Sequence, residues 1–393
     1  MGKLLADRRI RSFLLCLGLM AAGAALLLFP QEAMAAAREG LALCGNVIVP
    51  SLFPFFVLSS LVVELGLAGY LGRALEKVMR PLFHVSGECA SAVVLGFVGG
   101  YPVGARTAIE LYRGGHCTRT EAERLLAFCN NSGPAFILGV VGAGVFADSR
   151  VGLLLYLAHA AASLCVGLCF RFYRWHGETG EERGHSVVEV RRLSRAFVDS
   201  VKGGCTAVLN ICSFVVLFTV VIRLLVVSGF LPALSGMLAA LFSPLGLDRV
   251  WAERLLTGAL ELTSGVWTLA GEGSLTGRTA MAAFLLGWAG LSVHCQTLSF
   301  LADSGLSART YLTGKLLHGA LSAAFMAALV HLLPLDEAAG AYLAEEVEGL
   351  ARLDFATAIS GSVAAAWCVF LLFFLAAVLG ARKSGRKKRK SVV

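Results

Sequence analysis

The sequence predicts an all-α polytopic membrane protein with about eight spanning helices and two re-entrant hairpins in an inverted repeat. Of its 393 residues, 57% are hydrophobic and only 15% are charged, and the mean hydropathy is +0.75. The apolar residues form long continuous runs, and most of these runs are long enough to cross a bilayer as a helix. The runs of the first half of the chain recur in the same order in the second half, which indicates two related units.

Ten apolar runs are expected to form helices within the membrane. They cover residues 12–30, 41–65, 89–112, 123–147, 150–172, 203–229, 252–270, 279–302, 309–333 and 357–380. The first run follows a basic N-terminus and precedes Ala33-Met34-Ala35, which resembles a cleavage site, but its length favours an uncleaved span. Residues 66–84 include a stretch in which apolar and charged residues alternate, as in a helix that lies on a membrane surface.

Motifs of the first half recur at an offset of about 150 to 160 residues. The matching pairs are Cys44 to Ser60 with the stretch from Cys205 onward, Pro81-Leu82 with Pro244-Leu245, Glu110-Leu111 with Glu261-Leu262, and Leu157-Ala158-His159 with Leu316-Leu317-His318. We therefore divide the chain into an N-terminal span (1–40), a first repeat (41–172), a linker (173–202), a second repeat (203–333) and a final segment (334–393). The final segment holds an acidic loop, the last span and a basic tail.

Positive charge sets the expected orientation, because basic loops stay in the cytoplasm. Segments 113–124 and 171–202 are rich in arginine, and the chain ends in a basic run from Arg382 to Lys390. All three are cytoplasmic only if 89–112 turns back at Gly99-Gly100-Tyr101-Pro102 and 252–270 forms a second hairpin that enters from the other face. The halves then have opposite orientations, as in inverted-repeat carriers, and both termini are cytoplasmic. The second hairpin lacks proline, so its turn is expected at Gly258, Thr263, Ser264 and Gly265.

Two of the runs contain interruptions that an ordinary membrane helix would not have. The first is Gly99-Gly100-Tyr101-Pro102-Val103-Gly104-Ala105-Arg106, and the second is Cys129-Asn130-Asn131-Ser132-Gly133-Pro134. Proline cannot continue the helical hydrogen bonds, and irregular backbone at membrane depth survives only where protein or a water-filled cavity satisfies it. A plain proline kink would explain one such break. Two breaks with polar side chains beside them favour a substrate or ion site.

Arg106 lies inside an apolar run, and its planar guanidinium suits a carboxylate. The alternative is a structural ion pair with Glu110, four residues further along the helix. Asn130, Asn131 and Ser132 offer hydrogen-bond donors and acceptors at the second break. A half-helix after Pro134 would direct the positive end of its dipole at an anion. The expected substrate-binding residues of the first half are thus Tyr101, Pro102, Gly104, Arg106, Asn130, Asn131 and Ser132.

The matching region of the second half reads Gly290-Leu291-Ser292-Val293-His294-Cys295-Gln296. Ser292, His294 and Gln296 alternate, which favours an unwound segment over one helical face, and we expect them to bind substrate. A buried structural histidine is the alternative for His294. Glu261, Thr263 and Ser264 on the facing hairpin are candidates for binding a coupling cation or proton, although Glu261 could instead pair with Lys315 or Arg254. His159 and His318 are repeat mates for which we favour a structural role.

Composition and motifs argue against several other classes of protein. Much of the net charge of +8 lies in the C-terminal tail. Its position directly after the last predicted span indicates a cytoplasmic stop signal rather than a nucleic-acid-binding surface. The 11 cysteines lie mostly in apolar runs without a CxxC pair, so we expect reduced buried thiols, no metal site and no cofactor. Motifs of zinc proteases, serine hydrolases and nucleotide-binding enzymes are absent, so we expect no enzyme.

Several of these motifs together resemble the YlbJ-type sporulation integral membrane proteins of the nucleoside-recognition (Gate) group. The resemblance is carried by Pro50-Ser51-Leu52-Phe53-Pro54, Gly100-Tyr101-Pro102-Val103-Gly104, the run from Glu121 into Cys129-Asn130-Asn131-Ser132-Gly133-Pro134, and Gly290 to Gln296. It covers roughly residues 40–333. It implies a protein of the cell membrane or outer forespore membrane of a spore-forming bacterium, and a relationship to concentrative nucleoside carriers.

The resemblance also implies movement of a small anion across the membrane, and dipicolinate is the substrate that it favours. The expected mechanism is alternating access, with a lipid bilayer, a small anionic substrate, and a coupling cation or proton as partners, and with a homo-oligomer left open. A nucleoside or another small metabolite is the second substrate class. A scaffold of spore assembly that transports nothing is the rival from another class, but it has no need of Arg106, Asn130, Asn131, His294 and Gln296 at membrane depth.

Overall fold

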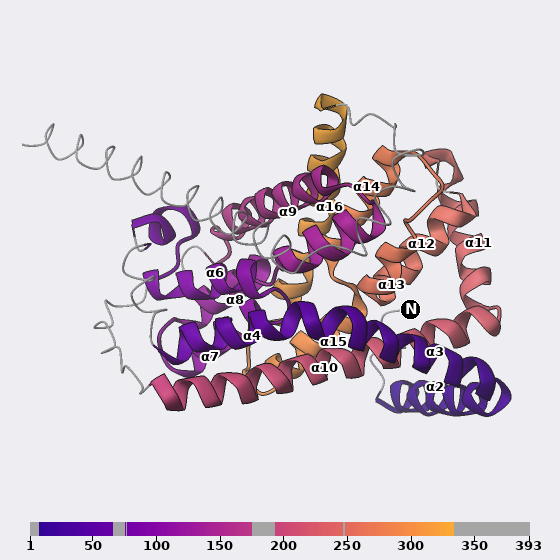
Figure 1. Ribbon diagram of the computed structural model, residues 1–393, viewed down its shortest axis with the longest axis horizontal. Coiled ribbons are helices and arrows are strands. Elements are labelled where there is room, and N and C mark those ends of the chain that lie inside the picture. Colours follow the sequence, from indigo (N-terminus) through magenta and orange to yellow (C-terminus); the bar gives the residue numbers. More distant parts are fainter. Residues whose placement is uncertain (1–7, 66–74, 76, 175–192, 247, 334–393) are drawn as a thin grey trace, which may run out of the picture.

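Helices and their connecting turns make up all of the computed structural model that is described, namely residues 8–65, 75, 77–174, 193–246 and 248–333 (Figure 1). No strand occurs in these ranges. The expected all-α fold is therefore confirmed for this part of the chain. The predicted acidic loop, last span and basic tail (334–393), most of the linker and part of 66–84 lie outside the described residues.

The helices of the first half follow one another with two marked interruptions. They are α2 (Arg8–Leu28), α3 (Pro30–Leu43), a π-helical turn (Cys44–Ile48), α4 (Val49–Glu64), a 3₁₀ turn (Gly87–Cys89), α6 (Ala90–Gly99), α7 (Val103–Arg113), α8 (Arg119–Phe128), the π-helix η3 (Ala135–Val145) and α9 (Ser149–Phe170). The interruptions lie between α6 and α7 and between α8 and η3. Both coincide with the breaks expected from the sequence.

The second half contains a long helix followed by a similar series. Its elements are α10 (Leu193–Val227), α11 (Phe230–Phe242), a 3₁₀ turn (Ser243–Leu245), α12 (Arg249–Leu260), α13 (Leu262–Trp267), α14 (Leu275–Trp288), α15 (Gly290–Leu301) and α16 (Ala308–Leu332). Helix α10 runs along α3 and α4, on one edge of the molecule in Figure 1. Helix α16 packs against α8, α9 and α14.

Four described helical stretches are long and apolar enough to cross a membrane: Ser149–Phe170, Leu193–Val227, Leu275–Leu301 and Ala308–Leu332. Two bent pairs would bring the number to six, namely Cys16–Leu28 with Pro30–Asn46, bent by 95°, and Lys77–Phe83 with Gly87–Gly99, bent by 90°. Since the expected last span, 357–380, lies outside the described residues, the figure of about eight spans stays a prediction.

Three apolar clusters form the core, and α16 contributes to the two larger ones. One joins α6, α7 and α8 to the first turn of α16, where Tyr311 is fully buried. The other joins η3, α9, α13 and α14 to the second half of α16, where Met326 is fully buried. Because α16 belongs to the second half of the chain and α8, η3 and α9 to the first, burial of these side chains holds the two halves together.

Helices α6 and α7 form a hairpin whose arms touch. A Cβ atom added at Gly104 would lie 2.8 Å from Gly96 Cα and 2.0 Å from the carbonyl oxygen of Cys129. Gly100 adopts a φ of +75° at the tip, where an L side chain would be strained. The expected turn at Gly-Gly-Tyr-Pro is thus confirmed, and only glycine lets its arms and the second break approach so closely.

Helices α12 and α13 form the second hairpin, but its turn differs from the expected one. Glu261 is extended (φ −141°, ψ 121°) between the two helices, and a Cβ atom at Gly265 would lie 2.1 Å from Gly258 Cα. Gly258 and Gly265 therefore face each other in the arms, and the turn lies at Glu261. The sequence match of Glu110 with Glu261 also fails in space, because Glu110 lies within α7 while Glu261 forms a tip.

The break between α14 and α15 also differs from the expectation. Ala289 and Gly290 have positive φ values of 80° and 77°, and Ser292, His294 and Gln296 then lie within the helix α15 rather than in an unwound segment. The alternation of these polar residues predicted the wrong local structure. In a helix, residues four apart share a face, so Ser292 and Gln296 point together and His294 points elsewhere.

The contact at Gly104 yields a stability prediction. Gly104→Ala should destabilise the protein by about 1–3 kcal/mol or more, because the new methyl group meets backbone atoms that cannot rotate away. The measurement is thermal unfolding of the purified protein. Gly236→Ala in α11 is the matched control, since no atom lies within 4 Å of its added Cβ. Equal melting temperatures of the Gly104 variant and the wild type would contradict this packing.

Candidate functional site

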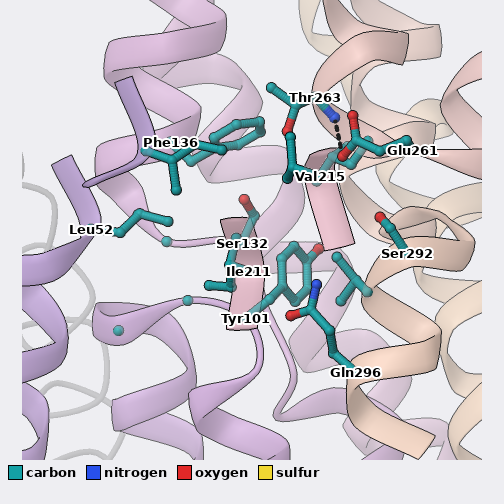
Figure 2. A pocket seen from close by; sticks show the side chains of 16 residues that line it. Leu52, Tyr101, Ser132, Phe136, Ile211, Val215, Glu261, Thr263, Ser292 and Gln296 are labelled. Carbon is teal, nitrogen blue, oxygen red and sulfur yellow. Dashed lines mark hydrogen bonds between the residues drawn. The ribbon is translucent and has the colours of Figure 1, made fainter. Parts of the chain in front are cut away.

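One cavity lies where the tips of both hairpins meet both broken helices (Figure 2). About 60 Å³ of it is accessible to the centre of a water-sized sphere, and the cavity is partly open to the surface. Its walls are mainly apolar. They are formed by Ile48, Leu52, Gly99, Gly100, Tyr101, Ser132, Gly133, Phe136, Ile211, Val215, Glu261, Leu262, Thr263, Ser292, Val293 and Gln296.

Six of the residues expected from the sequence line this cavity. They come from four separate segments that the fold brings together: Tyr101, Ser132, Glu261, Thr263, Ser292 and Gln296. The others, Pro102, Gly104, Arg106, Asn130, Asn131, Ser264 and His294, do not line it. A cavity with a few converging polar groups among apolar walls is the usual form of a small-molecule site.

Glu261 is the charged residue of the cavity lining, and it is almost fully buried. Its carboxylate caps α13 by accepting hydrogen bonds from the amides of Thr263 (3.0 Å) and Ser264 (2.6 Å). Neither of the expected alternatives is observed, because Arg254 donates to the carbonyl of Glu272 and Lys315 to that of Asn130. Backbone amides alone, among the described residues, thus stabilise this carboxylate.

Two helix N-termini end at the cavity, one from each half of the chain. Ser132 and Gly133 directly precede η3, Phe136 lies in its first turn, and Ser292 and Val293 lie in the first turn of α15. Neither helix has a side-chain cap. The N-terminus of a helix carries partial positive charge and amide groups that lack helical partners. Both ends therefore present partial positive charge to the cavity, which suits an anion, although at η3 the amides of Phe136 and Ile137 already donate to Gly133 O.

A buried polar network lies behind the cavity and centres on the hydroxyl of Tyr311. This hydroxyl donates to Thr297 Oγ1 (3.2 Å), accepts from Asn130 Nδ2 (3.4 Å) and lies 3.0 Å from His294 Nδ1. Asn130 therefore links the broken segment of the first half to α15 and α16 of the second half. His294 belongs to this network, which favours its structural alternative.

Lys315 is the residue that the sequence analysis considered only as a partner for Glu261. It is fully buried in α16, and its Nζ donates to the carbonyl oxygen of Asn130 at 2.9 Å and lies 4.9 Å from the centroid of the Tyr101 ring. A single lysine within the apolar run 309–333 was the available signal, because ionisable residues within a membrane usually have a function.

Both repeat-mate histidines contact this lysine or the second break. The ring centroids of His159 and His318 are 4.3 Å apart. His318 Nδ1 lies 3.4 Å from Lys315 Nζ, and the amide of Ser132 donates to His159 Nε2 at 3.1 Å. These contacts support the backbone of the break, in agreement with the structural role favoured for the two residues.

Arg106 lies outside the cavity and forms the ion pair that was its alternative interpretation. Its Nε is 2.8 Å from Glu110 Oε1, and both side chains are 49% exposed. A pair so exposed contributes little stability, on the order of 0–1 kcal/mol. A role of Arg106 in substrate binding stays a prediction, and this geometry gives it no contact with the cavity.

Several polar atoms around the breaks have no hydrogen-bond partner within the described residues. They include Ser132 Oγ at the cavity wall, together with Asn130 Oδ1, Asn131 Oδ1, His159 Nδ1 and His294 Nε2. Buried polar atoms are usually satisfied, so such atoms mark places where a ligand or water is expected. No group of three or more His, Cys, Asp or Glu side chains that could hold a metal occurs in the same ranges.

A family model described as Gate, nucleoside recognition, matches residues 47–170. The chain is 32% identical over 319 residues to the sporulation integral membrane protein YlbJ of Bacillus subtilis, an alignment that covers 76% of this chain and 77% of the relative. The sequence resemblance and the expectation of an integral membrane protein are therefore confirmed.

Solved structures of CNTnw are also similar to this chain. The structure of CNTnw in an inward-facing substrate-bound state has a TM-score of 0.45 and 18% identity, over 84% of this chain and 89% of CNTnw. A variant of CNTnw in an outward-facing state has a TM-score of 0.44 and 17% identity, over 84% and 88%. With such low scores these two structures carry no argument about the site.

The Tyr311 network yields a second stability prediction. Tyr311→Phe should destabilise the protein by about 1–3 kcal/mol, because it leaves buried polar groups of Asn130, His294 and Thr297 with one partner fewer. Thermal unfolding measures the change. Tyr112→Phe in α7 is the control, since no hydrogen bond of its hydroxyl is found in the described ranges. An unchanged melting temperature of the Tyr311 variant would show that the network contributes nothing.

Proposed function

Because the chain belongs to the family of the sporulation integral membrane protein YlbJ, we propose that it is a membrane carrier for a small anionic metabolite during sporulation. Dipicolinate is the substrate that we propose, and alternating access is the mechanism. The carrier works in the cell membrane or the outer forespore membrane, with both termini in the cytoplasm. The coarser conclusion, an integral membrane protein related to a sporulation protein, rests on the identity reported above.

The observation that carries the proposal is the pair of helix N-termini that meet at one cavity. The starts of η3 and α15 both lack a side-chain cap and both line the space. Dipicolinate is a flat ring with two carboxylates, and each helix end could receive one of them. The ring would lie against the apolar wall, near Tyr101 and Phe136 (Figure 2).

The polar side chains of the lining supply further contacts in this proposal. Ser132, whose Oγ has no described partner, and Ser292 stand at the two helix N-termini, and Gln296 adds an amide one turn beyond Ser292. Glu261, Thr263 and Ser264 remain the candidates for binding a coupling cation or proton. The negative charge of Glu261 would repel an anionic substrate in the same cavity. A cation or proton that binds together with the substrate would reduce this repulsion.

Alternating access is supported by how the two halves meet. Each half provides one hairpin and one broken helix, and all four elements end at the same cavity. If the halves have opposite orientations, movement of one set of elements against the other would open the cavity to one side at a time. The five-part division of the chain and its inverted topology belong to this proposal.

A nucleoside is the second candidate substrate, and one observation favours it. The family model matched by residues 47–170 is described as nucleoside recognition, and the cavity combines aromatic rings with an amide and a carboxylate that could bind a base and sugar hydroxyls. A scaffold that transports nothing is the third candidate. It would leave unexplained why polar side chains converge on a cavity.

The first prediction from this proposal concerns the substrate. Vesicles that contain the purified protein should take up labelled dipicolinate in a saturable manner and should not take up uridine, because the cavity offers two helix N-termini for carboxylates. Protein-free vesicles provide the background. Uptake of uridine without dipicolinate would replace the proposed substrate by the second candidate, and uptake of neither would favour the scaffold.

The second prediction concerns Gln296. Gln296→Leu should weaken the apparent affinity for dipicolinate about 10- to 150-fold, since one hydrogen bond to a charged group contributes roughly 1.5–3 kcal/mol. Concentration dependence of uptake measures the change. Gln31→Leu, at an exposed position of α3, is the matched control and should behave as the wild type. An unaltered affinity of the Gln296 variant would exclude it from the substrate contacts.

A further inference from the structure

Lys315 is a buried ionisable side chain that the cavity lining alone does not explain. Its side chain is fully buried, and it makes no ion pair with a carboxylate in the described part of the chain. A charge inside a membrane protein is costly unless hydrogen bonds or an opposite charge stabilise it. This lysine lies between the second break and the tip of the first hairpin, and we therefore expect it to have a function.

The hydrogen bonds around Lys315 determine which nitrogens carry protons. His318 Nε2 lies 2.9 Å from the carbonyl oxygen of His159, and a carbonyl can only accept, so Nε2 is protonated and Nδ1 of this neutral ring is an acceptor. The amide of Ser132 donates to His159 Nε2, so that nitrogen is unprotonated. Lys315 thus has two polar acceptors, Asn130 O at 2.9 Å and His318 Nδ1 at 3.4 Å.

The two acceptors, Asn130 O and His318 Nδ1, can be hydrogen-bonded by Lys315 whether its amine is neutral or protonated. A neutral amine has two N–H bonds to donate, whereas an ammonium has three. The third N–H finds no polar acceptor among the described residues, and the face of the Tyr101 ring lies nearby, with the centroid 4.9 Å from Nζ. Loss of this proton therefore breaks no polar hydrogen bond that the described part of the chain makes.

The cavity begins on the Tyr101 ring, which lines it, while Lys315 does not. The Tyr101 ring would then separate an anion in the cavity from an ammonium at Lys315, and each charge would stabilise the other. Such stabilisation is reciprocal by thermodynamic necessity. The hydrogen bond to Asn130 O also ties the lysine to the segment whose Ser132 and Gly133 line the cavity.

We propose that Lys315 is a proton site of the carrier, which takes up a proton as an anion binds and releases it as the anion leaves. The proton comes from water, adds to the amine nitrogen to form an ammonium, and returns to water afterwards, so charge and atoms balance. The inference rests on the proposed function, because it requires an anionic substrate. It adds a coupling site that differs from Glu261, Thr263 and Ser264.

Other titratable groups surround Lys315 and bear on its charge. Those that face it are His318 and Tyr311 of α16, His159 of α9, Cys129 after α8, Tyr101 at the hairpin tip and His294 of α15. No carboxylate is among them. Arg278, the one ionisable side chain of α14, is bonded to the carbonyl of Leu269, away from this cluster.

The test is calorimetric binding of dipicolinate to the purified protein in buffers of different ionisation enthalpy, from mildly acidic to mildly alkaline pH. Wild-type protein should take up as much as one proton per bound dipicolinate, and its affinity should fall with rising pH by up to about tenfold per pH unit. Lys315→Met should bind more weakly, by about 5- to 150-fold at acidic pH, and without linked proton uptake. Lys315→Arg should bind without proton uptake, because arginine keeps its charge.

The matched control is Lys202→Met, which removes an exposed lysine of α10 and should keep the proton uptake of the wild type. Dipicolinate binding by the wild type without proton uptake, or proton uptake retained in Lys315→Met, would overturn the inference while the proposed function stands. Absence of dipicolinate binding at every pH would instead overturn the proposed function.

A measurement without ligand then tests whether Lys315 itself titrates. The difference in melting temperature between the wild type and Lys315→Met should change with pH, because only the wild type has this titrating group. A pH-dependent difference would support a titrating site even without dipicolinate binding, and a constant difference would overturn it. This measurement also detects a variant that fails to fold.

Discussion

A helix that is broken inside a bilayer leaves backbone amides and carbonyls without partners, and this constraint organises the site. At the second break, Lys315 donates to Asn130 O, Ser163 donates to Phe128 O, and His159 accepts from the amide of Ser132. At the second hairpin, Glu261 accepts from the amides of Thr263 and Ser264. The polar side chains that look anomalous in an apolar sequence are therefore, first of all, the partners of irregular backbone.

The same constraint requires the breaks to lie close to the hairpin tips. Gly104 lets the first hairpin touch the carbonyl of Cys129, and Gly265 lets the arms of the second hairpin touch. Where the four segments cannot fill the space between them, the cavity remains, with one end of each broken helix at its wall. The packing that hides the breaks thus also builds the candidate site, which explains why its polar groups come from both halves of the chain.

Charge is distributed unevenly around this cavity. The negative group, Glu261, lines it and is held by backbone amides, while Lys315, which is positive when protonated, lies behind the Tyr101 ring and donates to a backbone carbonyl. Each is thus stabilised mainly by backbone dipoles rather than by a partner of opposite charge. The effect of each charge on a ligand is then not cancelled by a neighbouring ion.

The sequence alone determined the helical membrane fold, the position of the breaks at Gly100–Pro102 and Asn130–Gly133, and a set of polar residues of which six line the cavity. These follow from the length of apolar runs and from the backbone limits of proline and glycine, which act locally. Tertiary structure decided that Arg106 pairs with Glu110, that the second hairpin turns at Glu261, and that Lys315 reaches Asn130. Lys315 and Asn130, which are distant in sequence, meet only through the packing of α16 against the first half, and no local pattern records which backbone group a side chain will satisfy.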